Sequence, residues 1–244
     1  MIDAISQRVI ACERCPELRA YCAEVARIKK RAYAGQAYWG KPVPAFGDPH
    51  ARVALVGLAP GAHGSNRTGR MFTGDASGNW LYRALFRAGF ANQPNAVDAN
   101  DGLRLRDAIV TAAGRCAPPG NKPTPVQLQR CFPYLAEELA ALTRLRVVVG
   151  LGAIGTRAAA RALEAAGYRV ERAPFSHGAE RRARHGTRAE IVLLASYHPS
   201  RQNTNTGVLT EPMLDAIFAR ARALLSEQGP SGPARNGAPN ATLP

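Results

Sequence analysis

The sequence predicts an α/β fold: a three-layer α/β/α domain with a central, mostly parallel sheet. Short apolar runs such as Val53 to Val56 suit strands that are covered on both faces. Helix-forming segments with one apolar face separate these runs along the chain. This alternation of buried strands and amphipathic helices is the pattern of a parallel sheet with a helical layer on each side.

The composition fits one domain followed by a tail. The chain has 244 residues, of which 46% are hydrophobic, and this suffices for one sizeable core. We expect the domain to span residues 1–226. Residues 227–244 are rich in Pro and Gly and poor in large apolar side chains, so we expect them to be disordered.

The chain is strongly basic. Its 32 Lys and Arg residues exceed its 18 Asp and Glu residues, which gives a formal charge of +14. Such an excess favours a polyanionic partner, although it can also serve solubility alone. No apolar run is long enough to cross a membrane, and residues 1–19 carry charges where a signal peptide is apolar. We therefore expect a soluble, cytoplasmic protein without a membrane partner.

The amino-terminal segment presents cysteines. Ile2 to Ala11 is expected to form a short helix, and Cys12 and Cys15 follow in the tight turn CERC. Cys22 lies on the next, charged helix, which leads into an aromatic connection without a regular period. In a reducing compartment a C-x-x-C pair indicates a metal site or a redox couple rather than a structural disulfide.

The first clear strand, Val53 to Val56, leads into a polar loop that ends where a helix resumes at Leu81. The loop is rich in glycine and carries histidine, arginine, Phe72 and Asp75. In an open α/β sheet, ligands bind at the carboxyl ends of the strands. This loop therefore predicts a site for a flat, polar, anionic ligand.

The remaining elements continue the alternation. The segment 79–89 places apolar side chains on one face of a helix that should cover the sheet. A second polar segment, HPSRQNTNTG from His198, leaves the carboxyl end of the last strand. The rest of the chain is expected to form strands over 105–111, 146–150, 168–172 and 190–196, helices over 125–142, 153–166 and 211–225, and a basic loop over 175–188.

Gly150, Gly152 and Gly155 match the GxGxxG pattern of a dinucleotide-binding turn, and Glu171 follows at a suitable distance. That pattern ordinarily belongs to the first strand of a nucleotide-binding half, whereas here a more polar loop already follows an earlier strand. Glycines at a strand-to-helix turn also permit close packing without any ligand. We therefore expect packing, and an NAD-dependent oxidoreductase is kept as an alternative function.

Four cysteines are candidates for one metal site: Cys12, Cys15, Cys116 and Cys131. Two thiolates on the amino-terminal turn and two from a distant loop and helix can close a tetrahedral site. Their spacing leaves zinc and an iron–sulfur cluster open, and unrelated buried thiols are the alternative. Cys22 fits a small buried apolar residue better than a fifth ligand.

The two polar loops, GLAPGAHGSNRTGRMFTGD and HPSRQNTNTG, together with the four cysteines resemble the uracil-DNA glycosylase superfamily, specifically family 5, or type b. The resemblance covers residues 2–225. It implies a structural [4Fe-4S] cluster with Cys12, Cys15, Cys116 and Cys131 as ligands. It also implies a monofunctional, hydrolytic enzyme of DNA repair, which removes uracil and other deaminated bases such as hypoxanthine from double-stranded DNA and leaves an abasic site.

A glycosylase flips a nucleotide out of the duplex, holds the base and breaks its bond to the sugar. By the resemblance, Phe72 is an aromatic floor for the base, and we expect His198 to donate a hydrogen bond to the departing anion. An ordinary core position for Phe72, a turn cap for Asn121 and a turn-shaping role for His198 are the alternatives. The residues expected to bind the base are Gly57, Ala59, Phe72 and Asn121, and those expected to contact DNA are Ser200, Arg201, Gln202 and Asn203.

One departure from related families concerns the catalytic carboxylate. Those families carry Asp, Asn or Glu inside the first motif to position water, whereas Leu58 and Ala59 are apolar here. Asp75 matches the residue proposed for this role in family 5, where it orients water or offsets the positive charge of the sugar. An N-cap of the following helix is the alternative role for Asp75.

The functional hypothesis is a uracil-DNA glycosylase that acts as a monomer near the nucleoid of a prokaryotic cell. The alternative from another class is a nucleic-acid-binding module that carries an iron–sulfur cluster or zinc and has no catalytic activity.

Overall fold

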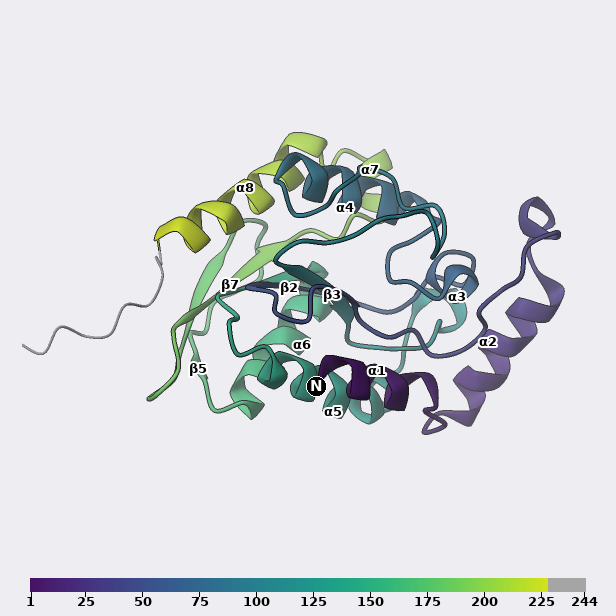
Figure 1. The fold of residues 1–244 in the computed structure, drawn as a ribbon, viewed down its shortest axis with the longest axis horizontal. Coiled ribbons are helices and arrows are strands. Elements are labelled where there is room, and N and C mark those ends of the chain that lie inside the picture. The colour runs from purple at the N-terminus through teal and green to yellow at the C-terminus, as the bar shows by residue number, and fades with distance from the viewer. Residues whose placement is uncertain (228–244) are drawn as a thin grey trace, which may run out of the picture.

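A seven-stranded sheet lies at the centre of the computed structural model, which describes residues 1–227 (Figure 1). Its strand order is β1-β3-β2-β4-β7-β6-β5. The four central strands β3, β2, β4 and β7 run parallel, while β1, β5 and β6 at the two edges pair antiparallel. The strands are β1 (Phe46–Gly47), β2 (Val53–Gly57), β3 (Ala108–Ala112), β4 (Val147–Leu151), β5 (Arg169–Val170), β6 (Glu180–Arg184) and β7 (Ile191–Ser196).

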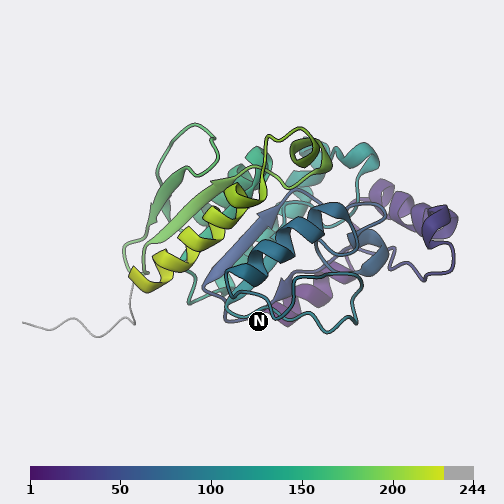
Figure 2. The ribbon, with the colours of Figure 1, turned by 90° about the horizontal axis from the view of Figure 1, so that it is seen from above.

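Helices cover both faces of the sheet. In Figure 1 α4 and α8 lie above it, and α1, α5 and α6 lie below it. Figure 2 looks down on α8 and α4, which lie side by side over the strands. The α-helices are α1 (Ile2–Ile10), α2 (Pro16–Ile28), α3 (Ser65–Thr68), α4 (Ala76–Arg87), α5 (Pro125–Ala141), α6 (Gly152–Ala165), α7 (Arg201–Asn205) and α8 (Glu211–Glu227), with 3-10 turns η1 (Arg31–Tyr33) and η2 (Pro119–Asn121). The expected three-layer α/β/α architecture is confirmed.

Two apolar cores explain why the central strands read as continuous apolar runs. Every residue of β2, β3, β4 and β7 is buried. Leu55 of β2 and Val149 of β4 contribute to the core beneath α4 and α8, whereas Ala54 and Val148 contribute to the core beneath α5 and α6. Successive side chains of a strand point to opposite faces, so a sheet with two helical layers needs apolar residues at every position.

The GxGxxG segment serves the packing of α6 against the sheet. A Cβ atom at Gly155 would collide with the carbonyl oxygen of Val56, and one at Gly150 would collide with Thr156. Gly152 has a positive φ of 80° and lies against His198, where a Cβ would be 3.2 Å from that of the histidine. The glycines therefore bring α6 close to β2 and place His198 beside the start of α6.

Some expected boundaries are wrong. The helix expected from Leu81 begins at Ala76, because the Asp75 side chain accepts a hydrogen bond from the Gly78 N–H and caps α4. The basic loop expected over 175–188 contains the antiparallel strand β6, in which Ala183 is fully buried while its arginine neighbours stay exposed. The polar segment after His198 contains the short helix α7, and the strand expected from Leu105 begins only at Ala108.

None of the described helices has the length and apolar character needed to cross a membrane. Of the tail expected to be disordered, residues 228–244 lie outside the described part of the chain.

Candidate active site

A cavity of about 870 Å³ opens at the carboxyl edge of the sheet. Loops that follow four parallel strands, β2, β3, β4 and β7, supply most of its wall. This is the position at which an open α/β sheet binds ligands, and the volume suits a small organic ligand. The expected site residues that line it are Ala59, Phe72, Asp75, Asn121, His198, Ser200, Arg201, Gln202 and Asn203.

Phe72 is held in an unusual backbone conformation. Its φ is 52°, in the left-handed region that costs a non-glycine residue about 1–3 kcal/mol unless its surroundings impose it. Its N–H donates to Ser65 Oγ at 3.0 Å, and a Cβ at Gly78 would collide with its carbonyl oxygen. Gly57 lies against the ring, where a Cβ would approach Phe72 Cε2 to 2.7 Å. Gly57 therefore supports the aromatic ring.

His198 lies beside Phe72, with 5.7 Å between the ring centroids and 33° between the ring planes. Burial lowers the pKa of its imidazole to about 4, so the ring is neutral near pH 7. A neutral imidazole has one N–H to donate and one nitrogen to accept. The His198 carbonyl accepts from Asn203 Nδ2 and from the Ser200 N–H, each at 2.8 Å, and these bonds fix the turn that carries the ring.

The two oxygens of Asp75 have different surroundings. Oδ1 accepts from the Gly78 N–H at 2.9 Å and caps α4, which is the alternative role considered above. Oδ2 faces Gly61 and Gly64, where added Cβ atoms would press on the carboxylate. Burial raises the pKa of Asp75. Hydrogen bonds from the backbone N–H groups of Gly78 and Ser77, and the positive charges of Arg201 and Arg67, act to lower it. Capping thus occupies one oxygen and leaves the other directed toward the glycine-rich loop.

The four residues expected to contact DNA divide into two pairs. Ser200 caps α7 by accepting from the Asn203 N–H, and the Asn203 amide binds the His198 carbonyl. Arg201 and Gln202 are exposed at the rim of the cavity. Ser200 and Asn203 therefore organise the turn, whereas Arg201 and Gln202 project outward.

Four other residues at the cavity were given no role from the sequence. Lys30, Tyr33 and Lys122 lie in its wall, as does His63, whose Nδ1 is 3.1 Å from the Tyr38 hydroxyl. Burial, with the charges of Lys30 and Arg67, lowers the pKa of His63. His63 belongs to the glycine-rich loop, so its place in the motif is the signal that pointed to it.

Arg67 holds the glycine-rich loop together. It is buried, and its guanidinium donates to the carbonyl oxygens of His63 and Gly74 at 2.9 Å and to Gln36 Oε1 at 2.6 Å. It also stacks on Tyr33, 4.1 Å from the ring centroid. Arg67 therefore fixes the two ends of the segment between His63 and Gly74, close to Asp75.

The loop is also tied to the cysteine region. Asn66 is fully buried, and its Nδ2 donates to the carbonyl oxygen of Cys22 at 3.3 Å. Ala62 packs against the apolar cluster that contains Cys15, Cys22 and Cys116. These contacts connect α2 with the loop that carries the candidate catalytic residues.

The four candidate ligand cysteines approach one another from three segments. Cys15, Cys116 and Cys131 are buried and Cys12 is partly exposed. Burial raises the pKa of Cys131, and the neighbouring thiols of Cys15 and Cys12 add to the effect. Contact with Cys22 raises the pKa of Cys116, as do burial and the nearby Cys131. Within residues 1–227, no three such side chains are arranged to hold a single metal ion.

Two arginines beside these thiols have unused donors. Arg19 acts electrostatically on Cys22 and Cys116, and Arg115 acts on Cys131. The buried Nε and Nη1 atoms of both arginines have no hydrogen-bond partner in the described structure. Arg115 Nη2 binds Glu138 Oε2 at 2.6 Å in a fully enclosed ion pair. Buried donors without partners are costly, so this region favours an anionic group.

An α/β/α domain with a carboxyl-edge cavity that combines an aromatic ring, a partly buried carboxylate and a neutral histidine has the groups that a base-excision enzyme uses. Comparison with known proteins agrees. The chain belongs to the uracil DNA glycosylase superfamily, whose family model matches residues 44–222.

Similar proteins cover most of the chain. A protein named Type-5 uracil-DNA glycosylase from Thermus thermophilus is 49% identical over 91% of this chain and 97% of its own length. A protein of the same name from Mycobacterium bovis is 48% identical over 91% of this chain and 81% of its own length. One from Pyrobaculum aerophilum is 45% identical over 91% of this chain and 92% of its own length.

Proposed function

We propose that this chain is a monofunctional uracil-DNA glycosylase that flips uracil, and other deaminated bases such as hypoxanthine, out of double-stranded DNA and hydrolyses the bond between base and sugar. The uracil-DNA glycosylase activity rests on family membership and on 45–49% identity to proteins of that name. The observation that carries the mechanism is the joint placement of Phe72, His198 and Asp75 around one cavity.

The base is proposed to stack on Phe72. A base buried inside a duplex is out of reach of a concave site, so extrusion is the route by which it enters. Its edge is read by Asn121, whose amide offers both a donor and an acceptor, and Ala59 closes the wall nearby. Gly57 contributes by leaving room for the Phe72 ring.

Bond cleavage separates an anionic base from a sugar that carries positive charge. The N–H of neutral His198 donates to the carbonyl oxygen on which the departing base gathers negative charge, and this stabilises the leaving group. The free oxygen of Asp75 accepts a hydrogen from the attacking water or offsets the charge of the sugar. Water adds to the sugar carbon, the base leaves with the bonding electrons, and the two protons of water end on the new hydroxyl group and on the released base.

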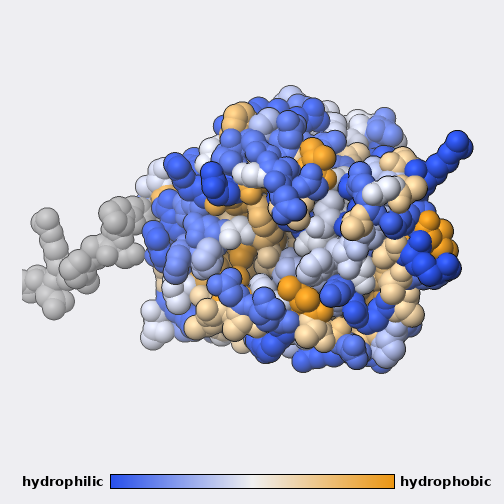
Figure 3. All heavy atoms as spheres, turned by 45° about the vertical axis from the view of Figure 1, so that its right-hand side comes forward, coloured by the Kyte–Doolittle hydropathy of each residue, from blue (hydrophilic) through white to orange (hydrophobic). Residues whose placement is uncertain are grey.

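Basic and polar residues at the rim are proposed to hold the DNA backbone. Arg201, Gln202, Lys30 and Lys122 surround the cavity mouth, and hydrophilic side chains cover most of the face shown in Figure 3. Backbone contacts of this kind position a duplex without reading its sequence. The formal charge of +14 supplies long-range attraction to the phosphates.

Cys12, Cys15, Cys116 and Cys131 are proposed to hold a [4Fe-4S] cluster. Four thiols gathered beside the unused donors of Arg19 and Arg115 suit an anionic group. Four cysteine thiolates can hold either a zinc ion or an iron–sulfur cluster, and the resemblance to family 5 favours the cluster. When bound, the cluster supplies a structural clamp between the amino-terminal turn, the loop after β3 and α5. We further propose that residues 1–226 form a single catalytic domain. We also propose that the protein acts as a monomer at the nucleoid.

A base-release assay tests the function. Wild-type protein and Asp75→Asn are incubated with duplexes that contain uracil, hypoxanthine or no lesion, and free base and abasic sites are measured. We expect rapid release from the first two duplexes by the wild type and much slower release by Asp75→Asn. Tight duplex binding without release of any base would favour the non-catalytic binding module instead.

A further inference from the structure

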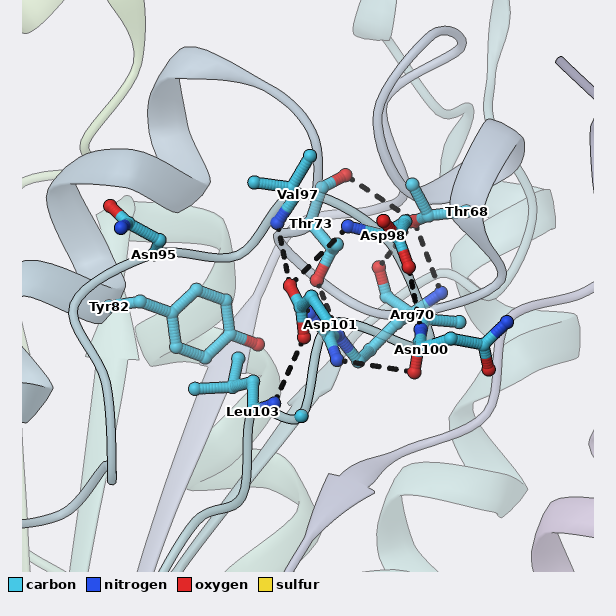
Figure 4. Close-up of polar contacts among 12 residues, drawn as sticks. Thr68, Arg70, Thr73, Tyr82, Asn95, Val97, Asp98, Asn100, Asp101 and Leu103 are labelled. Atoms are coloured by element: carbon cyan, nitrogen blue, oxygen red, sulfur yellow. Dashed lines mark hydrogen bonds and ion pairs between the residues drawn. The ribbon is translucent and has the colours of Figure 1, made fainter.

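The loop that carries Phe72 is braced by a buried ion pair behind it. Arg70 Nη2 lies 2.7 Å from Asp101 Oδ2, and the two side chains are only 5% and 10% exposed. Arg70 also stacks on Phe46, with 4.9 Å between the guanidinium carbon and the ring centroid. Figure 4 shows this pair at the centre of a network that joins the Phe72 loop to residues 95–103.

Arg70 acts directly on the backbone around Phe72. Its Nε donates to Thr73 Oγ1 at 2.9 Å, so one hydrogen bond bridges the residues on either side of Met71 and Phe72. Thr73 Oγ1 donates to the Met71 carbonyl at 3.2 Å, and the Tyr82 hydroxyl donates to the same carbonyl at 2.8 Å. The chain through Phe72 is therefore fixed from both sides at the point where φ is positive.

Asp101 connects this bridge with a second loop. Its Oδ2 accepts from the Val97 N–H at 2.7 Å, and its Oδ1 accepts from the Leu103 N–H at 3.0 Å. Burial alone would raise the pKa of Asp101, but hydrogen bonds from Arg70, Leu103 and Val97 lower it to about 2. Asp101 is therefore ionised at any working pH, and the loop it organises is held firmly.

The same loop reaches the candidate catalytic carboxylate. The Gly74 N–H donates to the carbonyl of Ala96 at 2.8 Å, one residue before Val97. Gly74 immediately precedes Asp75. The ion pair therefore braces both Phe72 and Asp75 from outside the cavity, because neither Arg70 nor Asp101 is part of its wall.

We propose that Arg70 and Asp101 are positioning residues for the reaction, which set the aromatic floor and the carboxylate in their relative places. This inference rests on the proposed glycosylase function. It assigns no contact with the substrate to either residue. Its physical reason is that a strained backbone stays in place only when its surroundings fix it, and reacting groups displaced by about 1 Å lose rate steeply.

The chain offers a matched control in Asp107. It too is a largely enclosed aspartate that binds an arginine, accepting from Arg52 Nε and Nη2, and its side chain is 15% exposed. The Asp107–Arg52 pair lies at the amino ends of β2 and β3, opposite the cavity. Asp107→Asn therefore breaks an aspartate–arginine pair far from the site, although Arg52 is 34% exposed and Arg70 only 5%, and Asn tolerates the positive φ of this position.

The test compares Asp101→Asn, Arg70→Lys, their double variant and Asp107→Asn. Single-turnover uracil release at saturating enzyme should fall on the order of ten- to a hundredfold in Asp101→Asn and Arg70→Lys and stay near wild type in Asp107→Asn. Duplex affinity should change little in any of them. The double variant should be no slower than the slower single variant, because both substitutions break one interaction.

Hydrogen exchange provides a readout that needs no activity. Amides of residues 71–75 should exchange faster in Asp101→Asn and Arg70→Lys than in Asp107→Asn at matched stability. A wild type that releases no uracil would contradict the proposed function, while the exchange result would still decide whether the pair braces the loop. Unchanged exchange, or a rate loss in Asp107→Asn as large as in Asp101→Asn, would overturn the positioning role.

Discussion

The rings of Phe72 and His198 lie 5.7 Å apart at their centroids, next to each other in one wall of the cavity. A base inserted between two rings needs roughly 7 Å between them, twice the contact distance of carbon atoms. A base therefore does not fit between the two rings, and in the proposed mechanism it stacks on Phe72 with its edge toward His198. In this proposed arrangement Phe72 stacks on the base whose departing charge His198 stabilises.

Asp75→Asn should separate capping from catalysis. Asparagine caps helices about as well as aspartate, so the fold and duplex binding should be retained. Uracil release should fall on the order of a hundredfold or more, as expected for a positioned acid or base. In the wild type, release should decline as pH falls through the raised pKa of Asp75, because the ionised carboxylate is the active form. Near-wild-type release by the variant would restrict Asp75 to capping α4.

His198 should make stability depend on pH. Its pKa is about 4 in the folded protein and close to 6.5 in an unfolded chain, so the unfolded state binds a proton that the folded state excludes. The free energy of unfolding should therefore fall as pH is lowered from about 6.5 toward about 4. Thermal unfolding of the wild type and His198→Asn checks this, and the variant should lack part of the slope. The lowered pKa values of His63 and His177 contribute equally to both proteins.

Asn203 and Gln202 should behave differently although they are neighbours. Asn203→Ala removes the hydrogen bond that fixes the His198 carbonyl, so release should slow while duplex affinity changes little. Gln202 is exposed at the rim, so Gln202→Ala should weaken duplex binding and spare the single-turnover rate. The two measurements are a binding titration and single-turnover release. Identical profiles for both variants would contradict this division of roles.

The assignment of Cys12, Cys15, Cys116 and Cys131 as cluster ligands predicts that cysteine variants differ in their iron content. Cys12→Ser and Cys131→Ser should lose iron, visible absorbance and soluble yield together, because a cluster that clamps distant segments contributes to folding. Cys22→Ser is the control and should keep iron and yield. An equal loss of iron in all three variants would contradict the ligand assignment, and zinc in place of iron would contradict the cluster.

Duplex affinity should depend steeply on salt. Each phosphate that the protein neutralises contributes a slope of about −0.9 to the plot of log affinity against log salt concentration. Arg201→Ala should therefore make the slope shallower by about one such step. Arg184→Ala is the control. Because Arg184 is already paired with Glu171 and Glu190, its loss should leave the slope unchanged. A flat plot for the wild type would argue against DNA as the partner.

The strands of the central sheet were predictable because both of their faces are buried. Each of these strands therefore appears in the sequence as a continuous apolar run. β6 was missed because its exposed arginines hide the alternation around Ala183. The start of α4 directly after Asp75 was considered only as the alternative, because Ser77, Gly78 and Asn79 are poor helix formers that depend on the Asp75 cap. The partnership of Arg70 with Asp101 joins residues far apart in the chain, and no local pattern records such a contact.

The hydrogen bond from Asn66 to the Cys22 carbonyl has a consequence for biosynthesis. A chain leaves the ribosome at roughly 5–20 residues per second, and Cys131 is made more than a hundred residues after Cys15. Until then Cys15 and Cys22 lack Cys131 as a neighbour, and the loop that binds the Cys22 carbonyl lacks part of its support. We therefore expect the glycine-rich loop to take its final place only after Cys131 has been made.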